Sequence, residues 1–87
     1  MMKFYGTMIC KHCVEAREAL NAAGVLFEYV DITVSTKNMR EFLHLRDTHK
    51  EFDEVREQGR IGVPCFVKDD GTLILGAQTL LDAANKA

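Results

Sequence analysis

The sequence predicts an α/β fold: a four-stranded mixed sheet with helices on both faces, in the order β-α-β-α(α)-β-β-α. Within the first 32 residues, two apolar, β-rich segments flank an amphipathic one, which is typical of a βαβ unit with parallel strands. Two later apolar runs are joined by Asp69-Asp70-Gly71, a strong signal for an antiparallel hairpin. Because 87 residues build only one modest core, we expect a single domain over residues 1–87.

The βαβ unit begins with a short apolar strand over residues 2–5. From Val14 to Ala23, small and apolar residues recur near helical spacing, and Gly24 is expected to end that helix. Residues 25–32 are rich in β-branched and aromatic side chains, so they are expected to form the second strand.

The middle of the chain predicts two further helices. Ser35 or Thr36 can cap the first of them. Thr48 is followed three residues later by Glu51, a capping-box pattern that predicts a second helix from Thr48 to Gln58.

The last third of the chain predicts the hairpin and a final helix. Its strands are expected over residues 63–67 and 72–75, and the helix over residues 79–86.

Composition excludes some function classes. Hydrophobic residues are 47% and charged residues 28%, with a net charge of −2, so nothing favours binding to nucleic acid or an anionic membrane. No segment approaches the roughly 20 apolar residues of a membrane span, and Gly6 interrupts any N-terminal secretory signal. We therefore expect a cytoplasmic monomer. In a reducing compartment, a close pair of cysteines is more often catalytic or metal-binding than structural.

Cys10 and Cys13 stand where the first strand gives way to a helix, separated by Lys11 and His12. The first N–H groups of a helix have no backbone partner and favour a thiolate, the nucleophile of disulfide exchange. Cys10 is therefore expected to attack a disulfide. Cys13, three residues later on the same side of the helix, is expected to resolve the mixed disulfide. Lys11 and His12 add groups that are, or can become, positively charged.

Two other interpretations of the pair remain. Both thiols could be core residues, although a core needs no paired spacing. A structural zinc site usually needs four ligands, and the chain offers one cysteine pair with His12 and the distant Cys65. A second signal is Pro64, the only proline, at the start of an expected strand, where proline is tolerated and where a cis bond can form.

The dithiol and Pro64 together resemble the thioredoxin superfamily, and the length and order of elements resemble its glutaredoxin branch. The matching segments are FYGTMICKHCVEAREALNAAGVLFEYVDIT, GVPCFV and LGAQTLLDA. The resemblance implies a Cys10 nucleophile, a resolving Cys13 and a cis Val63–Pro64 bond beside them. It also implies that Val63 docks an extended substrate through its backbone. The implied substrate-binding residues are Lys11, His12, Val63, Pro64, Gly76, Ala77 and Gln78.

The function implied by the resemblance is a cytoplasmic thiol-disulfide oxidoreductase in cell redox homeostasis and electron transport. It would reduce protein disulfides or glutathione mixed disulfides, coupled to glutathione or to thioredoxin reductase. No bound cofactor and no metal is expected, and glutathione is a candidate co-substrate. The alternative is a carrier of a metal or iron–sulfur cluster that uses the same cysteines.

The chain departs from the glutaredoxin pattern at several positions. Lys11 replaces the usual proline and His12 a common tyrosine. Thr7 stands where a basic residue often helps to hold glutathione, and Thr79 where the Gly-Gly turn is usually followed by an acid. The middle helical region is also longer than usual. These departures predict weak use of glutathione. Cys65 should point to the opposite face from Pro64, as a core thiol or, alternatively, as a third redox thiol or metal ligand.

Overall fold

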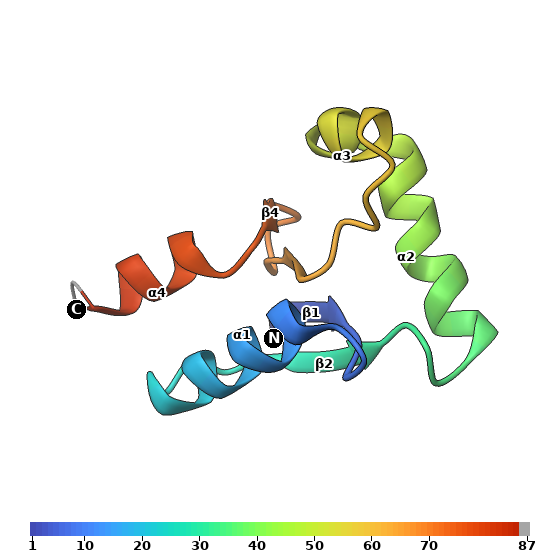
Figure 1. Ribbon diagram of the computed structural model, residues 1–87. Coiled ribbons are helices and arrows are strands. Elements are labelled where there is room, and N and C mark those ends of the chain that lie inside the picture. The colour runs from blue at the N-terminus through green and yellow to red at the C-terminus, as the bar shows by residue number, and fades with distance from the viewer. Residues whose placement is uncertain (86–87) are drawn as a thin grey trace.

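The computed structural model describes residues 1–85, and the predicted fold class is confirmed. Its four strands form one mixed sheet in the order β2-β1-β3-β4 (Figure 1). The strands are β1 (Lys3–Gly6), β2 (Glu28–Asp31), β3 (Cys65–Val67) and β4 (Leu73–Leu75). The helices are α1 (Lys11–Ala22), α2 (Thr36–Thr48), the 3₁₀ helix η1 (Lys50–Phe52), α3 (Asp53–Glu57) and α4 (Gln78–Asn85).

β1 lies inside the sheet and determines how the two halves of the chain meet. It pairs in parallel with β2, which confirms the predicted βαβ unit, and antiparallel with β3. β3 and β4 form the predicted antiparallel hairpin. At its tip Gly71 has a φ of +88°, a conformation that favours glycine, and its N–H donates to the carbonyl of Lys68. The Asp70 side chain accepts from the N–H of Thr72.

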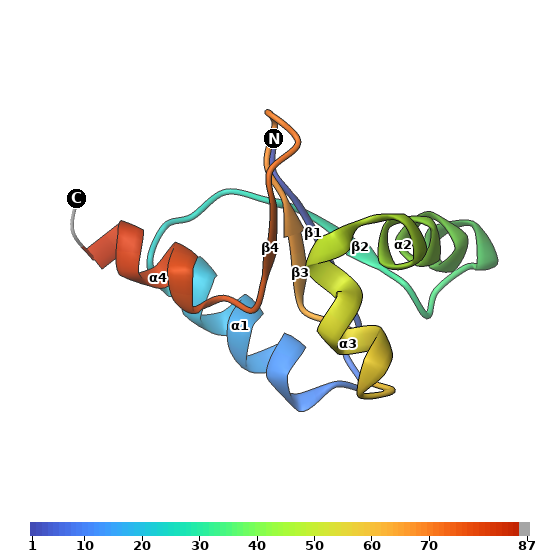
Figure 2. The same ribbon diagram turned by 90° about the horizontal axis from the view of Figure 1, so that it is seen from above.

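Helices cover both faces of the sheet, so two small cores form. Figure 2 shows α1 and α4 on one face and α2 and α3 on the other. Alternating residues of β1 enter opposite cores, as the pleat of a strand requires. Phe4 packs with Ala16, Leu20, Phe66 and Leu80 beneath α1 and α4. Tyr5 packs on the other face with Val30, Ile32, Phe42, Phe52, Val55, Cys65 and Leu73.

The helix boundaries confirm one predicted cap and correct another. Ser35 caps α2, and its hydroxyl oxygen accepts from the N–H of Asn38 at 3.1 Å. The capping box at Thr48 is wrong, because α2 continues through Thr48 and its hydroxyl donates back to the carbonyl of His44. The second helical segment of this region is instead η1 followed by α3.

The other boundaries differ from the predictions by a few residues. α1 begins at Lys11, three residues before the apolar pattern at Val14, and directly after Cys10. β2 is shorter than predicted, since Val25 donates its N–H back to Leu20 and the side chain of Leu26 is exposed. The final helix is observed through Asn85, and Lys86 lies outside the described residues. None of the helices in residues 1–85 is both long and apolar enough to cross a membrane.

Candidate functional site

Cys10 occupies the N-cap of α1, at the end of the loop that follows β1. Its backbone is extended, with φ −100° and ψ 119°, and its carbonyl accepts from the N–H of Val14 at 3.1 Å. Its side chain makes no capping hydrogen bond and is half-buried. The sulfur therefore stays free for chemistry at a helix end whose dipole favours negative charge.

Cys13 lies one turn into α1 and is buried beneath it. Burial raises the pKa of the Cys13 thiol to about 12, opposed by a hydrogen bond with the backbone of Thr7 and reinforced by a hydrogen bond with the Cys10 side chain. The two thiols therefore lie near each other, as the spacing predicts. Cys13 packs tightly on β1, because a Cβ added to Gly6 would lie 3.2 Å from the Cys13 sulfur.

A chain of hydroxyl groups fixes the loop that leads to Cys10. Thr33 donates its hydroxyl to the Asp31 carboxylate at 2.6 Å, so Thr7 is the donor in the 2.8 Å hydrogen bond between the two threonines. The carbonyl of Thr7 accepts from the N–H of Cys10 at 3.2 Å. Thr7 is 4% exposed, so position 7 is part of this support and faces no open surface.

The Val63–Pro64 peptide bond is cis, as the resemblance implies. Pro64 is buried, and its carbonyl accepts from the N–H of Gly76 at 3.0 Å, which joins the cis-proline loop to the turn before α4. Within residues 1–85, neither the N–H nor the C=O of Val63 has a hydrogen-bond partner. Val63 therefore has free backbone groups for an extended ligand.

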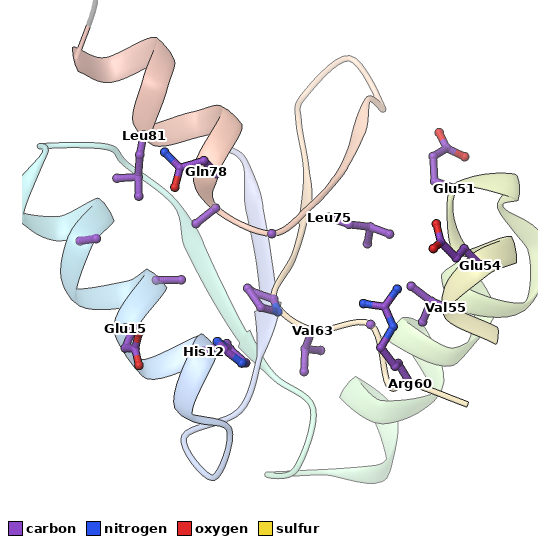
Figure 3. A pocket seen from close by; sticks show the side chains of 16 residues that line it. His12, Glu15, Glu51, Glu54, Val55, Arg60, Val63, Leu75, Gln78 and Leu81 are labelled. Atoms are coloured by element: carbon purple, nitrogen blue, oxygen red, sulfur yellow. The ribbon is translucent and has the colours of Figure 1, made fainter. Parts of the chain in front are cut away.

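Figure 3 shows a groove of about 700 Å³ that is lined by His12 and Pro64 but by neither Cys10 nor Cys13. One wall is formed by α1 and α4, the other by η1, α3 and the loop after α3. Pro64, Leu75 and Gly76 lie between the two walls. Because His12 lines the groove and stands between the two cysteines in sequence, the groove begins next to the dithiol.

Six of the seven predicted substrate-binding residues line this groove: His12, Val63, Pro64, Gly76, Ala77 and Gln78. Lys11 is the seventh and does not line it. Its side chain is 85% exposed and lies 3.8 Å from the Glu15 carboxylate, one helical turn along α1.

Sequence reasoning missed the charged residues of the opposite wall, Glu51, Glu54 and Arg60. Figure 3 shows their side chains grouped on the side of the groove that faces His12 and Glu15. Within residues 1–85, neither Glu51 nor Arg60 takes part in an ion pair. No local pattern identifies these residues as part of a groove, because only the packing of the middle helices brings them there.

One arginine attaches α2 to the backbone that leads into the cis-proline loop, and a second attaches α3 to the end of α2. Arg46 of α2 donates to the carbonyl of Ile61 at 3.0 Å and to that of Arg60 at 2.6 Å. Arg56 of α3 donates to the carbonyls of Arg46 and His49. The longer middle region therefore holds the backbone that leads into Val63.

Glycine at position 62 completes this attachment. Gly62 has a φ of +100°, and a Cβ there would lie 2.7 Å from the ring of Phe52. Any other residue would strain the backbone and push the loop away from η1.

Cys65 lies on the opposite face of the sheet from α1. It is fully buried in the core beneath α2 and α3, and burial raises the pKa of its thiol to about 12. This position agrees with the prediction of a packed core thiol that points away from Pro64. No group of three or more His, Cys, Asp or Glu side chains within residues 1–85 is arranged to hold a metal ion.

Comparison with solved structures places the chain in the thioredoxin-like fold. A point mutant of the thioredoxin-like protein BC3987 has a TM-score of 0.62 at 21% identity, over 92% of this chain and 90% of that one. The glutaredoxin from Methanosarcina mazei Go1 has a TM-score of 0.66 at 17% identity, over 95% of this chain and 76% of that one. A glutathione transferase homolog from Sulfitobacter, with bound glutathione, has a TM-score of 0.56 at 21% identity. That alignment covers 99% of this chain but only 36% of the transferase homolog.

A comparison with protein-family models finds no match. A protein of Haemophilus influenzae (strain ATCC 51907 / DSM 11121 / KW20 / Rd), named only "Uncharacterized protein", is 33% identical over 61 residues, which are 70% of this chain and 71% of that protein. The chain belongs to the same family as this Haemophilus protein.

Proposed function

We propose that the protein is a thiol-disulfide oxidoreductase that uses Cys10 and Cys13 to reduce disulfides of proteins or of glutathione. The main support is the arrangement at the start of α1, where a half-exposed thiol at the N-cap lies near a buried thiol one turn later. The cis-proline loop with free backbone groups at Val63 is the second support.

The reaction proceeds in two exchanges. The Cys10 thiolate attacks one sulfur of the substrate disulfide, forms a mixed disulfide and releases the first substrate thiol. Cys13 then loses its proton and attacks the Cys10 sulfur, which releases the second thiol. The substrate gains two electrons and two protons, and the protein is left with a Cys10–Cys13 disulfide. A thiol reductant, either glutathione or a reductase of the thioredoxin-reductase type, restores the dithiol.

The difference in burial supports this division of roles. Because the raised pKa of Cys13 keeps it as a thiol at neutral pH, Cys13 does not compete with Cys10 for the first attack. Cys13 becomes the nucleophile only once Cys10 is oxidised. In the mixed disulfide Cys10 carries no negative charge, so it no longer raises the pKa of Cys13, which lies one helical turn away.

The experiment is a pair of single substitutions assayed with a protein disulfide and with a glutathione mixed disulfide. Cys10→Ser is expected to abolish both reactions. Cys13→Ser is expected to accumulate a mixed disulfide, visible by mass spectrometry, and to retain the reactions that need one thiol. Equal loss in both variants contradicts the assignment. Visible absorption of protein purified without oxygen, lost in Cys10→Ser, supports the cluster carrier instead. Parallel assays with glutathione plus its reductase and with thioredoxin reductase identify the reductant.

A further inference from the structure

The groove is lined by more negatively charged side chains than positively charged ones, and two of the three carboxylates lie on one wall. Among residues 1–85, its lining contains three carboxylates, Glu15, Glu51 and Glu54, and one guanidinium, Arg60. His12 is the remaining ionisable group that these residues contribute to the lining. Glu15 is partly balanced by Lys11 at 3.8 Å, so the unbalanced carboxylates are those of the wall formed by η1 and α3.

The two carboxylates of that wall remain available to a ligand. Glu51 and Glu54 are exposed, and within residues 1–85 neither takes part in an ion pair. Glu54 accepts only from the neutral amide of Gln58 at 3.0 Å, which leaves its charge in place. They lie across the groove from His12, so a chain bound along Val63 would pass between His12 and these two carboxylates (Figure 3).

We propose that this groove selects disulfides flanked by positive charge, such as a cystine within a basic peptide segment, over anionic disulfides such as oxidised glutathione. This inference rests on the proposed function. Carboxylates along a groove attract a cation and repel an anion over about one Debye length, roughly 8 Å at physiological ionic strength. Arg60 alone does not reverse the sign, because two unbalanced carboxylates share its wall.

The test uses three small disulfides of different charge, each mixed with the fully reduced protein in a single turnover. Cystamine has two positive charges, hydroxyethyl disulfide has none, and oxidised glutathione is an anion. The measured quantity is the ratio of the rate constants for cystamine and oxidised glutathione. Comparing this ratio between variants cancels the intrinsic reactivity of each disulfide.

The first variant is Glu51→Gln with Glu54→Gln. We expect its ratio to fall about fivefold at low salt, which is about 1 kcal/mol at 1.4 kcal/mol per tenfold change. The matched control is Asp47→Asn with Glu57→Gln, which removes the same charge from exposed positions of α2 and α3 outside the groove. We expect the control to keep the wild-type ratio within about twofold, since screening weakens distant charges.

The second variant, Arg60→Gln, removes the only guanidinium of the groove and is expected to raise the ratio. The preference should also shrink as sodium chloride is added. An unchanged ratio in the first variant, or an equal fall in the control, overturns the inference. Failure of the reduced wild type to react with any of the three disulfides overturns the proposed function instead, so the two failures are distinguishable.

Discussion

Gly6 is expected to tolerate no side chain, and Gly6→Ala tests how closely α1 is packed on the sheet. An alanine Cβ at this position would lie 2.8 Å from Cε1 of Phe4 and 3.2 Å from the sulfur of Cys13. Gly6 has no positive φ, so alanine fits the backbone and should even stabilise by about 0.4–1 kcal/mol through the unfolded chain. The sign of the net effect therefore depends on whether the two neighbours can move.

The packing around Phe4 indicates that its ring cannot move away. It is fully buried, with ring centroids of Phe66, Tyr29 and Phe27 at 4.5, 5.0 and 5.2 Å. Overpacking of a well-filled core typically costs about 1–3 kcal/mol. After the stabilising effect on the unfolded chain is subtracted from this overpacking cost, we expect a net destabilisation of about 1–2 kcal/mol. For a domain of this size that corresponds to a melting temperature lowered by about 4–16 °C.

The assay is urea and thermal unfolding of the reduced wild type, Gly6→Ala, Phe4→Leu and the double variant. Because Phe4→Leu removes the ring atom nearest to the new Cβ, the double variant should lose less stability than the sum of the single changes. Gly6→Ala should also speed alkylation of Cys13, whose sulfur must shift outward. A Gly6→Ala protein as stable as wild type, or strict additivity in the double variant, would refute this account of the packing.

Three further predictions test the core, the loop and a helix cap. Burial raises the pKa of Cys65 above its unfolded value of about 8.5. The neutral thiol therefore contributes its full stabilisation of the fold below pH 8.5, and this contribution is lost as pH rises toward 12. Urea midpoints should fall over this pH range, and they should fall less in Cys65→Ala. Arg46→Ala removes the hydrogen bonds to the carbonyls of Arg60 and Ile61, and should raise the KM for a disulfide more than it lowers kcat, with partial rescue by Arg46→Lys. Ser35→Ala should cost about 1 kcal/mol in urea unfolding, since it removes the side-chain cap of α2.

The sequence predicted what depends on local pattern. The parallel β1–β2 pair and the β3–β4 hairpin followed from apolar periodicity and from one Asp-Gly turn, and both are observed. Thr48 shows the limit of such patterns, because its hydroxyl donates to a carbonyl of the preceding turn and does not cap a new helix. A capping motif cannot reveal whether the previous helix has already ended.

The groove depends on long-range packing, which explains why only one of its walls was predicted. The residues near the dithiol, Pro64 and the glycine turn are marked by short motifs, and they do line the groove. Arg60 is marked by no motif, and the capping-box pattern that contains Glu51 predicts a helix start and no groove. Both residues reach the groove because Gly62 packs against Phe52 and because Arg46 binds the loop carbonyls. Lys11 lies outside the groove for a local reason, since its helical position directs it toward Glu15.

The position of Thr7 changes how weak use of glutathione should be explained. The resemblance implies that a cation is missing at position 7 and an acid at position 79, so Thr7→Lys with Thr79→Asp would be the expected remedy. The structure argues against the first of these changes, because Thr7 is buried and its hydroxyl donates to Thr33 within the network that supports the loop before Cys10. A lysine would break this network and place an ammonium group in a buried site, which is costly without a partner. The available cation is Arg60, on the far wall beside Glu51 and Glu54. We therefore expect affinity for an anionic tripeptide to depend on the balance of charge on that wall, and we expect removal of its carboxylates to improve it.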